Sequence, residues 1–200
     1  MNQHAADIMA LYRRHAKTWA TGRGKSLMEK AWLDRFLALA PPRAAILDIG
    51  CGAGDPIARY LLQQGCDVSG VDSSPDMIAL CQRDFPAGDW RVADMRRLSL
   101  GRVFDGLIAW DSFFHLTPDD QRAMFAIFRA HAAPGAALMF TSGPRAGVAM
   151  GELEGDPLYH ASLDGDEYRS LLTASGFAVV EHMTEDPACG GNTVWLAQAR

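Results

Sequence analysis

The sequence predicts an α/β fold with a doubly wound, mostly parallel sheet of seven strands, of which the last is antiparallel. Short apolar runs alternate with helical segments over residues 44–175, which is typical of parallel βαβ units. The chain then ends in two β-rich runs, 177–184 and 193–199, joined by a short turn without a helix, so these runs must pair antiparallel. Finally, glycines follow the first apolar run, where open α/β sheets bind ligands.

Length and composition favour one domain with a substantial core. The chain has 200 residues, of which 48% are hydrophobic, and a formal net charge of -5. No apolar run approaches the ~20 residues that span a bilayer, and charges near the start argue against a secretory signal. The acidic balance also argues against a nucleic-acid partner. The four cysteines form no CxxC pair, so we expect reduced thiols, no metal site and a cytoplasmic protein.

Two helical segments precede the sheet. Apolar residues recur at helical spacing over residues 5–19, and the glycines of 21–24 are expected to end this helix. A second helix is expected over residues 26–39, because two consecutive prolines then stop it. We therefore expect residues 1–42 to form a helical lid over a main domain of residues 43–200.

The rest of the chain alternates between strands and helices. Each expected helix begins with Asp, Ser or Thr close to its first turn, and proline follows in most of them, which is a strong start signal. The stretch 142–163 is rich in glycine and proline, so we expect a loop or lid there. The expected strands are 44–49, 67–71, 90–93, 104–110, 136–141, 177–184 and 193–199, with helices from 55 and over 74–84, 117–131 and 164–175.

The glycine-rich stretch and a later acid point to an adenosine-type cofactor. Residues 46–55 read ILDIGCGAGD, and glycines let the backbone approach a ligand closely. The second strand ends at Asp72, where a carboxylate can hold ribose hydroxyls. A pyrophosphate would meet Asp55 and Asp48, which disfavours a nicotinamide-dependent oxidoreductase. S-adenosylmethionine, which carries a sulfonium and an ammonium and no phosphate, removes that difficulty.

Five motifs in order, ILDIGCGAGDP, GVDSSPDMI, VADM, FDGLIAWDSFFHL and PGAALMF, resemble the class I S-adenosylmethionine-dependent methyltransferases over roughly residues 44–200. The resemblance implies a Rossmann-like methyltransferase fold in which Asp48 faces the cofactor's ammonium and Asp72 its ribose. Two of the implied residues also have a purely structural interpretation: Met77 is typical of helix packing, and Asp94 is typical of a cap on the next turn. The other implied contacts are Gly50, Cys51, Gly52 and Gly54 under the methionine portion, Ser73, Met77, Asp94 and Met95 around the adenine, and the backbone of Trp110.

The lid carries further candidates. Tyr12 and Trp19 share one face of the first helix, and Arg23 follows it. In similar leading segments of the family an aromatic ring covers the sulfonium by cation–π attraction and an arginine binds the carboxylate. Simple packing of the aromatic rings on the domain is the alternative.

The candidates for catalysis follow the fourth strand and lie in the 142–163 stretch. Asp111 and His115 come directly after the strand, and His160 stands beside a tyrosine. Imidazoles suit proton transfer near neutral pH, although packing or surface histidines are the alternatives. A base is needed only if the acceptor must lose a proton.

These observations predict in-line methyl transfer to a small-molecule acceptor, by a monomer or homodimer. An enclosed pocket under a lid favours a small acceptor, and the chain lacks the Asn/Asp-Pro-Pro-aromatic run of enzymes that methylate amino groups of nucleic acids. A catalytically silent module that binds S-adenosylmethionine is the alternative. The sequence leaves the acceptor and the methylated atom open.

Overall fold

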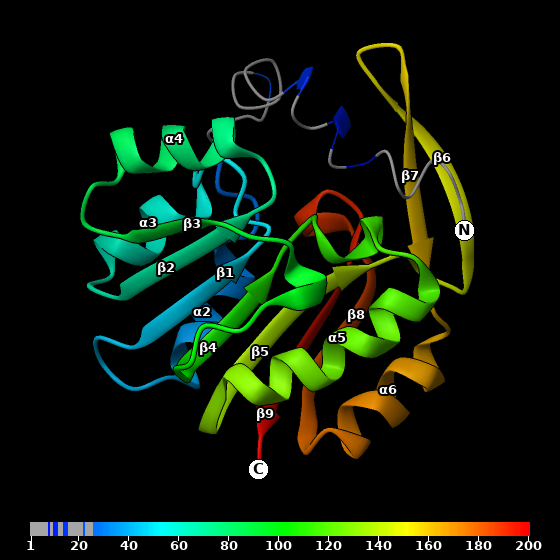
Figure 1. The fold of residues 1–200 in the computed structure, drawn as a ribbon. Helices are drawn as coiled ribbons and strands as arrows, with labels where there is room; N and C mark the ends of the chain where they lie inside the picture. The colour runs from blue at the N-terminus through cyan, green and yellow to red at the C-terminus, as the bar shows by residue number, and fades with distance from the viewer. Residues whose placement is uncertain (1–7, 9, 12–13, 16–21, 23–25) are drawn as a thin grey trace.

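A seven-stranded sheet in the order β3-β2-β1-β4-β5-β9-β8 forms the centre of the computed structural model (Figure 1). The structure describes residues 8, 10–11, 14–15, 22 and 26–200. Strands β1 to β5 pair in parallel, whereas β9 is antiparallel to both β5 and β8. This confirms the predicted sheet. Its strands are β1 (Ala45–Ile49), β2 (Asp67–Asp72), β3 (Asp89–Val92), β4 (Phe104–Ala109), β5 (Ala132–Ser142), β8 (Phe177–Asp186) and β9 (Asn192–Ala199).

Helices cover both faces of this sheet. Buried residues of α2, α3 and α4 share one hydrophobic cluster with one face, and those of α5 and α6 share a second cluster with the other face. The second cluster is rich in aromatic rings, among them Phe113, Phe125 and Phe140. The helices are α2 (Lys30–Ala38), α3 (Ile57–Gln63), α4 (Pro75–Asp84), α5 (Pro118–His131) and α6 (Gly165–Ala174), with short 3₁₀ turns η1 (Met95–Arg97), η2 (Phe113–His115) and η3 (Pro187–Cys189).

The helices begin where the sequence signals place them. Ser74, Thr117 and Asp164 are N-cap residues whose side chains accept a backbone N–H of the first turn. Proline occupies the first turn of α4 and α5, where its missing N–H costs nothing. Local chemistry therefore determines these starts.

Part of the N-terminal segment lies against a hairpin. The described residues between 8 and 22 are helical, including Gly22, so the helix end expected at 21–24 is wrong at that residue. A glycine in a helix costs only about 1 kcal/mol, which packing can offset. Arg14 Nη2 and His15 Nε2 each lie 2.9 Å from Asp156 Oδ2. Within the described part of the chain, no helix is long and apolar enough to span a membrane.

That hairpin replaces the loop expected over residues 142–163. Its strands β6 (Gly147–Leu153) and β7 (Asp156–Ser162) pair antiparallel and project beyond the main sheet (Figure 1). Glu154 and Gly155 connect them with φ of 52° and 85°, the two positive values that a type I′ turn requires. Because β6 is exposed along almost its whole length, no apolar alternation marks it in the sequence.

The ends of β1 and β4 meet at Gly50. Ser112 Oγ donates a hydrogen bond of 2.7 Å to the carbonyl oxygen of Ile49. A Cβ on Gly50 would lie 2.3 Å from Ser112 Cβ, so only glycine permits this approach. This joint fixes the start of the glycine loop relative to the segment after β4.

We predict that Gly50→Ala destabilises the fold by about 2–4 kcal/mol, because it adds a clash with the Ser112 side chain to the strain of a positive φ. Gly52→Ala is the matched control, since Gly52 also has a positive φ of 53° but a Cβ there meets no atom within 4 Å. Its cost is expected to be near 1 kcal/mol. Urea unfolding measures both, and equal losses would contradict the clash.

Candidate active site

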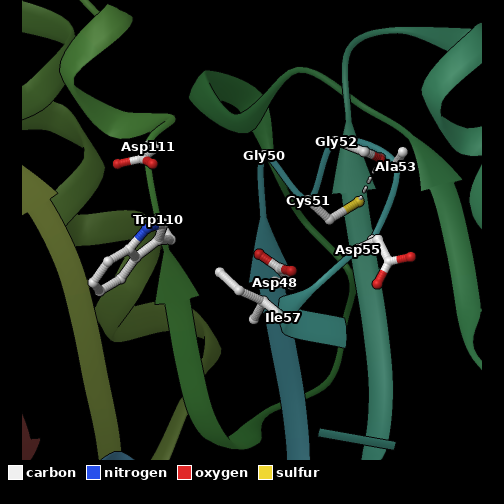
Figure 2. Close-up of a pocket in the computed structure, with 10 residues that line it drawn as sticks. Asp48, Gly50, Cys51, Gly52, Ala53, Asp55, Ile57, Trp110 and Asp111 are labelled. Carbon is white, nitrogen blue, oxygen red and sulfur yellow. Dashed lines mark hydrogen bonds between the residues drawn. The ribbon is translucent and has the colours of Figure 1, made fainter. Parts of the chain in front are cut away.

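A pocket of about 50 Å³ lies at the carboxyl ends of β1 and β4. The residues that line it are 50–55, Asp48, Ile57, Trp110 and Asp111. Figure 2 shows Trp110 and Asp111 on one side and the glycine loop with Asp55 on the other. Asp55 pairs with Arg59 at 2.7 Å, so its charge is already balanced, and the other two carboxylates that line the pocket belong to Asp48 and Asp111.

The glycine loop is anchored by its own backbone. The N–H groups of Gly50 and Cys51 both donate to the carbonyl oxygen of Val71, at 2.8 and 3.1 Å. Gly52 N–H donates to Asp72 Oδ2 at 3.0 Å, and Gly54 N–H donates to the Cys51 carbonyl oxygen at 2.9 Å. Positive φ values at Gly50, Gly52 and Gly54 make this turn possible. The loop is thus held against the end of β2.

Asp72 is the acid that the sequence places at the end of β2, and the structure puts it beside the loop. Besides Gly52, its carboxylate accepts the N–H of Ser74 at 2.8 Å. Burial raises the pKa of Asp72, while N–H donors from Ser74, Gly52 and Ser73 oppose that rise. A carboxylate offers about four lone pairs, so acceptor capacity remains for ribose hydroxyls.

The residues present fit an adenosine cofactor with an amino-acid end. Asp72 retains acceptor capacity, and a Cβ on Gly52 would meet no atom within 4 Å, so the loop offers open backbone to a ligand. Asp48 is 3% exposed and lines the pocket, where it can face an ammonium. Cys51 lies in the loop, and its hydrogen bond to Cys81 together with burial raises the pKa of its thiol.

The residues expected around the adenine differ in their burial and in their contacts within the protein. Asp94 caps η1 and pairs with Arg96 at 2.7 Å, which holds the pKa of that carboxyl below its usual range. Met77 is 1% exposed on α4, as helix packing requires. The Met95 methyl lies beside Gly50, and Ser73 is half-buried next to Asp72. Their adenine contacts stay predictions, as do those of Tyr12, Trp19 and Arg23, which lie outside the described residues.

The three candidates for catalysis come together above the pocket. The ring centroids of His115 on η2 and His160 on β7 lie 4.9 Å apart. The ring centroid of Phe114 lies 4.8 Å from that of His115 and 5.1 Å from that of His160. Burial lowers the pKa of His160, and the carboxylate of Asp111 opposes part of that lowering. Sequence reasoning did not single out Phe114, although it stood inside the quoted motif, because ring contacts across the hairpin leave no local signal.

The position of Asp111 depends on β5. Its N–H donates to Thr141 Oγ1 at 2.9 Å, and its backbone has φ of 47°, an uncommon value that Asp tolerates better than most residues. Thr141 is buried at the end of β5 and was not foreseen as part of the site. No pattern in the sequence reveals a hydrogen bond between residues 30 positions apart.

His115 does not suit the role of a base near neutral pH. Its Nδ1 lies 2.8 Å from the carbonyl oxygen of Tyr159, which can only accept, so Nδ1 carries the proton and Nε2 keeps a lone pair. Burial lowers the pKa of His115 to about 4. At neutral pH the residue is therefore a neutral hydrogen-bonding group and a weak base.

Comparison with known proteins agrees with this geometry. Residues 46–135 match the family described as a methyltransferase domain. The chain is 30% identical over 118 residues to a dTDP-3-amino-3,4,6-trideoxy-alpha-D-glucopyranose N,N-dimethyltransferase from Streptomyces venezuelae, covering 57% of this chain and 49% of that protein. It is 30% identical over 135 residues to a dTDP-3-amino-3,6-dideoxy-alpha-D-glucopyranose N,N-dimethyltransferase from Streptomyces fradiae, covering 66% and 43%. The chain spans about half the length of these curated relatives.

The fold is shared with solved structures. CalS10, an amino pentose methyltransferase from Micromonospora echinaspora solved with S-adenosylmethionine bound, aligns with a TM-score of 0.72 at 22% identity over 92% of this chain and 96% of that one. The matched methyltransferase domain over residues 46–135, the strand order and the glycine loop with its acid support the class I S-adenosylmethionine-dependent methyltransferases as the family that the sequence predicts.

We predict that Asp72→Ala weakens binding of S-adenosylhomocysteine by about 1–3 kcal/mol, because ribose hydroxyls and the Gly52 N–H lose their acceptor. Isothermal titration calorimetry measures the change. An unaltered affinity would remove Asp72 from the cofactor site.

We also predict that His115 makes the fold sensitive to acid. Its pKa is 6.5 in the unfolded chain and about 4 in the folded one, so the unfolded state binds more protons between these values. Stability is therefore lost as pH falls from 6.5 toward 4, by up to about 3 kcal/mol. His115→Asn keeps a donor for Tyr159 and does not titrate. Urea unfolding at pH 7 and pH 4 compares the two chains, and identical pH slopes would refute the assignment.

Proposed function

We propose that this protein transfers a methyl group from S-adenosylmethionine to an amino group of a small molecule, with amino sugars as the first class to test. The observation that carries the cofactor part is the glycine loop, which lines the pocket together with Asp48 and donates the Gly52 N–H to the carboxylate of Asp72. When bound, the cofactor supplies a methyl group on a cationic sulfur, which a neutral amine displaces to leave S-adenosylhomocysteine. Asp72 would hold the ribose and Asp48 would face the ammonium.

The proposed acceptor site lies between Asp111 and His160. Asp111 lines the cofactor pocket and also acts electrostatically on His160, so one carboxylate borders both regions. An amine gains a positive charge on methylation, and a nearby carboxylate stabilises that charge. His160 would then accept the proton that the product releases. The rings of Phe114 and His115 border this region and limit its contact with water.

The acceptor class is supported by the relatives. The two curated relatives are named as N,N-dimethyltransferases of amino sugars attached to dTDP, and CalS10 is named as an amino pentose methyltransferase. A catalytically silent module has no support among these relatives. Because the chain spans about half of the curated relatives, the sugar and its nucleotide remain to be tested separately.

The remaining proposals concern the lid, the cellular location and the oligomeric state. We propose that the part of the expected lid that precedes α2 covers the site, supported by the contacts of Arg14 and His15 with Asp156 on the hairpin that carries His160, whereas α2 itself packs in the core against the sheet. A cytoplasmic location is proposed, as the cysteine spacing in the sequence predicts. A monomer or a homodimer is proposed for the assembly.

Release of S-adenosylhomocysteine tests the function. Wild-type protein is mixed with S-adenosylmethionine and a panel of amino sugars, their dTDP derivatives and the matching hydroxyl compounds. We expect turnover with amines and none with the hydroxyl compounds. Methylation of the hydroxyl compounds alone would contradict an amine acceptor, and tight cofactor binding without turnover on any class would favour the silent module.

We predict that His160→Gln and Asp111→Asn each lower kcat roughly a hundredfold, since proton acceptance and charge stabilisation are lost. The affinity of His160→Gln for S-adenosylhomocysteine is expected to change by less than about threefold, because His160 does not line the cofactor pocket. His182→Gln is the control, because that ring stacks on Trp195 at the β8 side of the sheet. Wild-type kcat in both site variants would contradict the proposed acceptor site.

A further inference from the structure

Trp110 carries a buried hydrogen-bond donor beside the proposed cofactor pocket. The residue follows β4, is 4% exposed and lines the pocket together with Asp48 and Asp111 (Figure 2). Among the described residues, no protein atom accepts a hydrogen bond from its indole Nε1. A buried N–H without an acceptor costs about 1–3 kcal/mol, and most buried polar groups in native proteins are satisfied. This donor therefore needs a partner that is not part of the described chain.

Other tryptophans show that this is not a general feature of the fold. Trp32 Nε1 donates to Asp186 Oδ2 at 2.8 Å, Trp90 Nε1 to the Phe85 carbonyl oxygen at 2.7 Å, and Trp195 Nε1 to Ser142 Oγ at 3.0 Å. Those three indoles are buried in the core and find acceptors there. Trp110 is buried to the same degree, but it borders the pocket.

The pocket contains few other donors. The N–H groups of Gly50, Cys51, Gly52 and Gly54 all donate within the protein. Of the side chains that line the pocket in the described structure, that of Trp110 alone carries a nitrogen donor. The same walls carry the carboxylates of Asp48 and Asp111. A ligand group with both an ammonium and a carboxylate matches this arrangement, because the acids attract the ammonium and the indole N–H can serve the carboxylate.

We propose that the indole Nε1–H of Trp110 donates a hydrogen bond to the α-carboxylate of the bound cofactor. This assigns to the side chain a role beyond the backbone contacts expected from the sequence, and it rests on the proposed use of S-adenosylmethionine. Hydrogen bonds to charged groups are the stronger ones, so the contact selects ligands that carry the amino-acid end. Trp110 is a binding residue in this scheme and takes no part in proton transfer.

The test compares two ligands on the full chain by calorimetry. S-adenosylhomocysteine carries the carboxylate, whereas its decarboxylated analogue keeps the ammonium and lacks only that group. We expect Trp110→Phe to weaken S-adenosylhomocysteine about tenfold or more, close to 1.4 kcal/mol. The decarboxylated analogue is expected to lose less than about twofold, since it makes no hydrogen bond to the indole.

Two further proteins separate the hydrogen bond from packing. Benzothienylalanine at position 110 keeps the ring volume and removes only the N–H, so it should reproduce the selective loss even if the phenylalanine variant folds poorly. Trp90→Phe is the matched control, because Trp90 is buried and its N–H already has a protein acceptor. It should change the affinities for the two ligands by the same factor.

The outcomes are distinct. A selective loss for S-adenosylhomocysteine in both position-110 variants supports the proposal. Equal losses for the two ligands, or no loss, would overturn it, and so would an unchanged cofactor affinity with a raised KM for the acceptor. Failure of the wild-type chain to bind S-adenosylhomocysteine at all would instead contradict the proposed function.

Discussion

The carboxylate of Asp72 is the contact on which the cofactor site depends. It accepts the N–H of Gly52 in the loop after β1 and the N–H of Ser74 at the start of α4. One side chain at the end of β2 therefore positions both the glycine loop and the next helix. Its burial raises the pKa of the carboxyl, and the backbone donors offset part of that cost. The carboxylate oxygens that hold the loop and the helix retain lone pairs, so the group that organises this part of the fold is also the one proposed to bind the ribose.

A second joint connects this cofactor half to the proposed acceptor half. Ser112 binds the carbonyl oxygen of Ile49, and Asp111, the residue before it, is held by Thr141 on β5. The segment after β4 is thereby fixed between β1 and β5. Asp111 lines the pocket on one side and acts on His160 of the hairpin on the other. Because Asp111 follows β4 directly and is bonded to β5, the sheet positions this carboxylate between the proposed cofactor and acceptor sites.

The polar groups of the site differ in their charge and in their hydrogen-bond partners. Burial keeps His115 neutral, and its Nδ1 proton is committed to Tyr159. His160 keeps a carboxylate neighbour that favours its charged form, so of the two imidazoles it is the better proton acceptor. Asp55, in contrast, is balanced by Arg59 and adds little charge to the pocket. Asp48 and Asp111 face Trp110, whose N–H has no protein acceptor among the described residues. A zwitterionic amino-acid end complements that combination.

The sequence by itself determined the sheet, the glycine loop and the place of Asp72 at the end of β2. Hydrophobic periodicity, helix-capping residues and glycine-rich turns are local signals that act within a few residues. It could not determine that residues 147–162 form a hairpin, since β6 is exposed and carries no apolar alternation. It also could not show that Asp94 is occupied by Arg96, or that His115 is buried against Tyr159 and so loses its basicity. Nor could it show that the indole N–H of Trp110 is buried without an acceptor among the described residues. Burial and hydrogen-bond pairing between distant segments are properties of the tertiary structure, and they decided which candidate side chains remain available for chemistry.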